Sequence, residues 1–69
     1  MGTIKVIELI GSSAKSWEEA ASNAVREAAA TVSGIVGVEV AAQTAKVSGD
    51  RITEYRSTVK VAFAVKGDR

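Results

Sequence analysis

The sequence predicts an α+β fold in which one helix packs on a three-stranded antiparallel sheet, in the order strand, helix, strand, strand. Three observations predict this βαββ fold. Residues 4–10 are rich in β-branched side chains, alanines recur at helical spacing after residue 17, and two long strand-like segments follow. The 69 residues contain no linker or repeat, so we expect one domain over residues 1–69.

The first strand is expected over residues 4–10 and is expected to end at Gly11, with Ser12 and Ser13 in a connecting loop. A helix is expected to follow from Ser16 to about residue 32. Its apolar side carries alanines, and its other side carries polar and charged residues. We expect this helix to be amphipathic and to pack its alanine side on the sheet.

A capping box is expected at the start of this helix. In that motif the Ser16 hydroxyl accepts a hydrogen bond from the amide of Glu19, and the Glu19 side chain returns to the amide of Ser16. Trp17 follows directly, and we expect it to hold the helix onto the strands instead of stacking on a ligand.

A β-hairpin is expected next, with strands over residues 35–47 and 52–65 and a turn over residues 48–51. Placing Ser48 opposite Arg51 sets the register. One face then pairs Val36 with Phe63, Val38 with Val61, and Val40 with Val59. The other face pairs Glu39 with Lys60, Gln43 with Arg56, and Gly37 with Ala62.

Composition narrows the classes of function. The net charge is +1, so the basic excess of a nucleic-acid-binding protein is missing. No apolar run is long enough for a transmembrane helix and no signal peptide is visible, so we expect a cytoplasmic protein with no membrane partner. The chain has no histidine and no cysteine, and we therefore expect no enzymatic activity.

The lengths of the elements predict self-assembly. A helix of about 16 residues is roughly 24 Å long, whereas strands of about 13 residues reach roughly 43 Å. The helix would leave half of the hairpin uncovered, and a core of alanine and valine buries little area per residue. We therefore expect the main partner to be the protein itself, in a symmetric homo-oligomer.

The order and spacing of these segments resemble the dodecin family over nearly the whole chain. The matching stretches are residues 5–13 (KVIELIGSS), 16–21 (SWEEAA), 38–40 (VEV) and 55–63 (YRSTVKVAF). The resemblance implies a βαββ fold and a hollow, spherical homododecamer. It also implies a small-molecule ligand, a flavin such as riboflavin or FMN, which is stored or quenched instead of converted.

Two departures from the flavin-binding pattern bear on the ligand. Gly37 stands where flavin-binding members carry a stacking tryptophan, and Arg56 stands where they carry a glutamine that bonds the ring edge. With neighbouring Val38 and Gln43, these are the candidate ligand-binding residues. The combination of Trp17 with Arg56 is similar to the calcium-associated type of dodecin.

Two interpretations of function remain open. The first is a flavin-binding storage shell, and the second is a shell that binds calcium or phosphorylated anions such as coenzyme A. Asp50, in the hairpin turn, is a carboxylate that several copies together could offer to calcium. Arg56 either pairs with Gln43 on the next strand or meets its symmetry mate and binds an anion.

Overall fold

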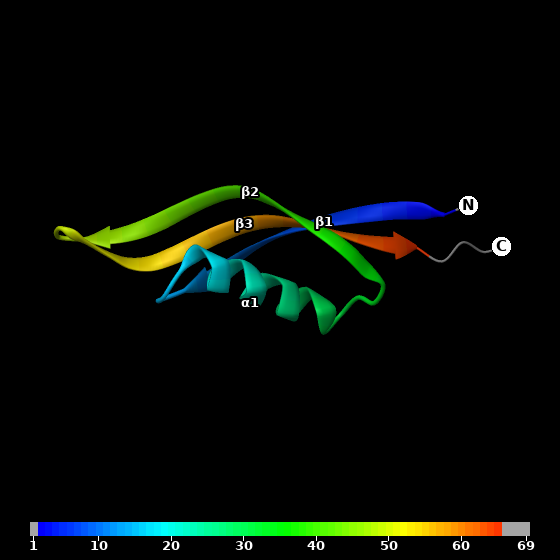
Figure 1. Ribbon diagram of the computed structural model, residues 1–69, viewed down its shortest axis with the longest axis horizontal. Helices are drawn as coiled ribbons and strands as arrows, with labels where there is room; N and C mark the ends of the chain where they lie inside the picture. The colour runs from blue at the N-terminus through cyan, green and yellow to red at the C-terminus, as the bar shows by residue number, and fades with distance from the viewer. Residues whose placement is uncertain (1, 66–69) are drawn as a thin grey trace.

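The computed structural model describes residues 2–65 and confirms the βαββ fold. Its elements are β1 (Thr3–Ser13), α1 (Trp17–Ala29), β2 (Ile35–Ser48) and β3 (Arg51–Val65). The sheet is antiparallel throughout, with β3 in the centre and strand order β1-β3-β2. Helix α1 lies against one face, and the β2–β3 hairpin runs past the helix to its turn (Figure 1).

The start of α1 follows its capping residue, although the predicted capping box forms only in part. Ser16 is the N-cap, and its Oγ accepts a hydrogen bond from the amide of Glu19 at 3.0 Å. The return bond from the Glu19 side chain is not formed. The amide of Ser16 instead donates to Oγ of Ser13, which also accepts from the amide of Lys15 at 2.9 Å. Ser13 therefore accepts the hydrogen bond from the Ser16 amide that the predicted capping box gives to Glu19.

The predicted helix end near residue 32 is wrong by one turn. Helix α1 ends at Ala29, and the amide of Val32 then bonds the Ala28 carbonyl at 2.9 Å in a closing turn. Val32 still packs on the core from this turn, which explains its place in the apolar pattern. Gly34, with φ +79°, then turns the chain into β2.

The core is thin and lies between α1 and the centre of the sheet. Its buried apolar side chains are Ala20, Ala24, Ala28, Val59 and Val61. Partly buried Ile7, Leu9 and Ile35 pack against this cluster. Because alanine side chains are short, the helix approaches the sheet closely, and a Cβ at Gly11 would overlap the Ala20 carbonyl oxygen. This close approach explains why the residue of β1 under the helix is a glycine.

Strand β1 is longer than predicted. Gly11, Ser12 and Ser13 were expected in a loop, yet they continue the strand to Ser13 and pair with Ser57, Arg56 and Tyr55. Glycine and serine are typical loop residues, but here the long β3 provides a partner for every one of them. The extension places Ser12 on the sheet beside Arg56.

The predicted hairpin register is right at the turn and from Gly37 to Val40, and it is wrong between these two segments and at Phe63. Ser48 lies opposite Arg51, as expected, and so do the predicted pairs Glu39 with Lys60 and Gly37 with Ala62. Irregularities at Lys46/Val47 and Val40/Ala42 shift the segment between them by one residue. A third, at Ile35/Gly37, puts Ile35 and not Val36 opposite Phe63.

The central shift changes which side chains share a face. Arg56 lies opposite Thr44, and Gln43 lies opposite the buried Ser57. The predicted pair of Gln43 with Arg56 is therefore wrong. A β-bulge inserts one residue and moves the following side chains to the other face of a strand, and a pair of such irregularities cannot be found from residue spacing alone.

Candidate functional site

The two faces of the sheet differ in what covers them. On the helix side, residues 57, 59 and 61 of β3 are buried. The opposite, helix-free face carries the alternate residues of each strand, among them Ile4, Val6 and Ile10 of β1, which are exposed large hydrophobic residues. The helix-free face therefore has both apolar and charged groups available to a ligand or to another copy.

A shallow hollow of about 510 Å³ opens in the helix-free face near the start of β2. It is lined by Val6, Gly37, Val38, Glu39, Lys60 and Ala62. Val6, Ala62 and Gly37 lie side by side on the three strands and form a low apolar floor. The floor is lowest at Gly37 and Ala62, which carry no side-chain atoms beyond Cβ, and this low part suits a flat ring.

Gly37 has no conformational reason to be a glycine. Its φ is not positive, unlike those of Gly34 and Gly49. A Cβ atom at this position would have no other atom within 4 Å. The position therefore has room for a larger side chain within one chain. The missing side chain is what leaves the floor bare.

The rim of the hollow is charged. Lys60 lies between Glu8 on β1 and Glu39 on β2 in a row across the sheet. Within residues 2–65, the one ion pair joins Arg56 to Glu54, so Lys60 has no carboxylate within 4.0 Å. An ammonium donor and a carboxylate acceptor thus stand at the edge of an apolar floor, where they can bond the polar edge of a ring.

The structure brings together only two of the four predicted site residues. Gly37 and Val38 line the hollow, whereas Arg56 lies six residues along β3 from Ala62, roughly 20 Å away at strand spacing. Gln43 lies on the helix side of the sheet, opposite Ser57. Within one chain, Arg56 and Gln43 therefore do not share the hollow with Gly37.

Several residues of the hollow were not predicted as site residues. The sequence predicts that Glu39 and Lys60 lie opposite each other, as the structure shows, but it indicates for them a role in sheet pairing and not in a site. Val6 and Ala62 were missed because their neighbourhood depends on the β1–β3 register, which was not predicted. The available signal was that β1 carries apolar residues on both faces, Ile4, Val6 and Ile10 on one and Ile7 and Leu9 on the other, which is typical of a strand that is covered on both faces.

Trp17 acts as a clamp, as predicted. Its Nε1 donates a hydrogen bond to the Thr44 carbonyl at 2.8 Å, and its ring packs edge-on against Tyr55 with 4.8 Å between centroids. Its own carbonyl accepts a hydrogen bond from Ser57 Oγ at 2.8 Å. These contacts tie the start of α1 to both strands of the hairpin.

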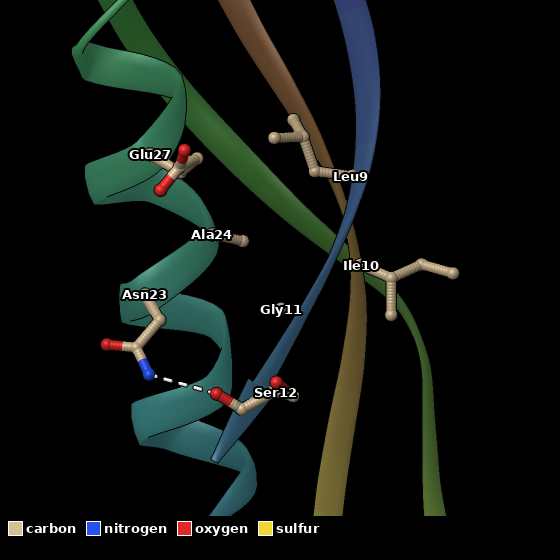
Figure 2. Close-up of a pocket in the computed structure, with 7 residues that line it drawn as sticks. All are labelled: Leu9, Ile10, Gly11, Ser12, Asn23, Ala24 and Glu27. Atoms are coloured by element: carbon tan, nitrogen blue, oxygen red, sulfur yellow. Dashed lines mark hydrogen bonds between the residues drawn. The ribbon is translucent and has the colours of Figure 1, made fainter.

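A second, smaller cleft of about 270 Å³ lies between α1 and the edge of β1. Figure 2 shows Asn23 reaching from the helix to the Ser12 carbonyl, with a hydrogen bond of 2.9 Å, while Ile10 points away from the helix. The Asn23 amide covers an open acceptor of the edge strand, so this cleft is a packing seam between helix and strand.

No metal centre or membrane helix is visible in the described part of the chain. Residues 2–65 contain no group of three or more His, Cys, Asp or Glu placed to hold a metal ion. Among the same residues, no helix has both the length and the apolar character to cross a bilayer.

The fold and the hollow define a small βαββ protein with a half-open hollow on the sheet face that the helix leaves bare. The chain belongs to the dodecin family, whose pattern matches residues 3–66. It is 36% identical over 66 residues to the calcium dodecin of Mycobacterium tuberculosis, covering 96% of this chain and 93% of that protein.

Solved structures show the same fold. An arginine-to-alanine mutant of Thermus thermophilus dodecin superposes with a TM-score of 0.92 at 25% identity, covering 99% of this chain and all of that one. The dodecin of Streptomyces coelicolor has a TM-score of 0.91 at 22% identity, with 97% and 96% covered. The family and the fold predicted from the sequence are thus confirmed.

Proposed function

We propose that this protein binds a flat, ring-bearing small molecule in the Gly37 hollow and stores it without converting it. The observation that carries the proposal is the bare apolar floor beside Lys60 and Glu39. The absence of histidine and cysteine from the sequence supports binding without catalysis, because the commonest general base and the thiol nucleophile are missing.

The binding form in this proposal is a hollow homododecamer. The hollow is open on one side, and the exposed aliphatic residues of the same sheet face, such as Val6 and Ile10, favour burial against a second copy. Twelve copies of the 7.1 kDa chain give about 85 kDa. We expect sedimentation to show this species, and a stable folded monomer would contradict it.

Flavins are the ligand class that fits best, with FMN preferred over riboflavin. Stacking of a ring on an aromatic side chain is worth about 1–3 kcal/mol, which corresponds to roughly ten- to a hundredfold in affinity. Gly37 provides no such stacking, so riboflavin is expected to bind weakly. Arg56 of a neighbouring copy offers a guanidinium to the phosphate of FMN.

A fluorescence titration with riboflavin and FMN tests the proposal. The double variant Gly37→Trp with Arg56→Gln is expected to gain riboflavin affinity and to quench flavin fluorescence, since the space at Gly37 is open. Arg56→Gln alone is the control and is expected to lower FMN binding without a gain for riboflavin. Tight riboflavin binding by the unchanged protein, or no gain by an assembled double variant, would contradict the proposed site.

Calcium binding between copies is a second candidate, favoured by the name of the Mycobacterium tuberculosis relative. Calcium requires six to eight oxygen ligands, so carboxylates such as Asp50 from several copies would have to meet on a symmetry axis. Calorimetry with calcium chloride is expected to show saturable binding that Asp50→Asn reduces. Equal binding by both proteins would exclude the hairpin turn as the site.

A further inference from the structure

Arg56 lies in a polar row that crosses the helix-free face of the sheet. Ser12 of β1 and Thr44 of β2 are its direct neighbours on either side. Residues directly opposite each other on one face have Cβ atoms about 4.5–5.5 Å apart. A guanidinium group between two hydroxyl groups is a set of hydrogen-bond donors suited to an oxyanion. This set depends on the register shift in β2, because without the shift Gln43, and not Thr44, would lie opposite Arg56.

This guanidinium already holds a carboxylate from its own strand. Nε of Arg56 donates to Oε2 of Glu54 at 3.0 Å, with 46% and 34% of the two side chains exposed. Of all the charged side chains within residues 2–65, these two form the one ion pair. The contact shows that an oxyanion fits at Arg56, and that an incoming anion meets Glu54 there.

A second cationic side chain, Lys46, lies next to Glu54 on the same face of the sheet. Lys46 lies directly opposite it on β2, yet the two side chains are not paired in this structure. If an anion takes Arg56, the carboxylate of Glu54 can turn to Lys46 and remain next to a positive charge. The exchange therefore does not leave an unpaired carboxylate beside the bound anion.

We propose that Glu54 sets the affinity of Arg56 for the phosphate group of a ligand, by competing for the guanidinium and moving to Lys46 when phosphate binds. A phosphate group carries about −1.5 to −2 charges and three acceptor oxygens. It therefore binds the Arg56 guanidinium more strongly than a single exposed carboxylate does. This inference rests on the proposed role of Arg56 as the anion contact and adds the residue that controls it.

Calorimetric titration of the assembled protein with inorganic pyrophosphate tests this role. Exposed ion pairs are worth about 0.2–1 kcal/mol, so Glu54→Gln is expected to tighten pyrophosphate binding by up to about fivefold, using 1.4 kcal/mol per decade. Arg56→Gln is expected to abolish binding. The gain should shrink as sodium chloride is raised. Glu18→Gln, which removes the same charge from the exposed side of α1, is the matched control.

The exchange with Lys46 has a separate signature. Lys46→Gln is expected to weaken pyrophosphate binding more in the presence of Glu54 than in the Glu54→Gln background, so the two changes are not additive. Additive effects would mean that Lys46 only attracts the anion and would overturn the exchange.

Three results would overturn the proposal itself: unchanged affinity in Glu54→Gln, weaker binding in Glu54→Gln, or no pyrophosphate binding by either protein. Weaker binding would show that Glu54 positions Arg56 instead of competing for it. Pyrophosphate has no ring to enter the Gly37 hollow, so failure of the ring site appears only in the riboflavin titration. Sedimentation of each variant confirms that assembly is intact.

Discussion

The helix side and the helix-free side of the sheet differ in how their side chains are packed and exposed. On the helix side, small apolar residues pack closely, Ser57 and Ser13 are buried with hydrogen-bond partners, and Trp17 closes one end. On the helix-free side, large apolar residues such as Ile10 are exposed, and Lys60 has no ion-pair partner among residues 2–65. The difference shows that the helix covers one face of the sheet only, and that the other face leaves large apolar and charged side chains exposed.

Assembly gives the largest expected effect. Ile10 is 67% exposed on the helix-free face, and we expect Ile10→Lys to abolish the large species in sedimentation, because a buried lysine without a partner costs several kcal/mol in every copy. Ser22→Lys adds the same charge on the exposed side of α1 and should leave assembly intact. An Ile10→Lys protein that still sediments near 85 kDa, roughly twelve copies, would place this residue outside the interface.

Two strand glycines compare the faces directly. Gly11→Ala places a Cβ against the Ala20 carbonyl and 2.9 Å from the Ala24 Cβ, whereas the same change at Gly37 meets nothing within 4 Å. We expect Gly11→Ala to lower the free energy of unfolding by about 1–3 kcal/mol, and Gly37→Ala to change it by less than about 0.5 kcal/mol.

Denaturant titrations of the two glycine variants check this comparison. Both must be run at one protein concentration, because the stability of an assembly depends on concentration. Equal losses in the two proteins would mean that the helix does not pack as closely on β1 as the structure shows.

The helix cap gives a smaller effect on the same side. Ser16→Ala removes the acceptor of the Glu19 amide and is expected to cost about 1 kcal/mol per chain. Ser22→Ala is a matched change inside the helix, at an exposed position, and should be neutral or slightly stabilising because alanine is the better helix former. A Ser16→Ala protein as stable as Ser22→Ala would mean that Ser13 alone is sufficient to hold the start of α1.

Local patterns in the sequence were enough to predict the fold, and the parts of the site that depend on long-range register were not. The periods of the strands and of α1, the cap at Ser16 and the Ser48–Arg51 turn are all encoded within a few residues. The pairing of β1 with β3 joins residues some fifty positions apart, and the shift that puts Thr44 beside Arg56 depends on two irregularities. Gly37 and Val38, which were predicted as site residues, both line the hollow, whereas Arg56 was paired with the wrong residue of β2.

The charged row across the helix-free face gives the smallest expected effect on stability and separates stability from binding. Lys60 lies between Glu8 and Glu39, but no carboxylate in the described part of the chain lies within 4.0 Å of its ammonium. Exposed charges at such distances are largely solvated, so Lys60→Gln should change the free energy of unfolding by less than about 0.5 kcal/mol. Because Lys60 lines the hollow, the same change should weaken FMN binding by about two- to fivefold, the loss of one exposed charged contact at 1.4 kcal/mol per decade.

Lys5→Gln is the matched control, since Lys5 is an exposed lysine of β1 that does not line the hollow. Unfolding and FMN titrations of both variants measure the two effects. A loss of stability in Lys60→Gln without a loss of FMN affinity would show that the row serves the sheet and not the ligand.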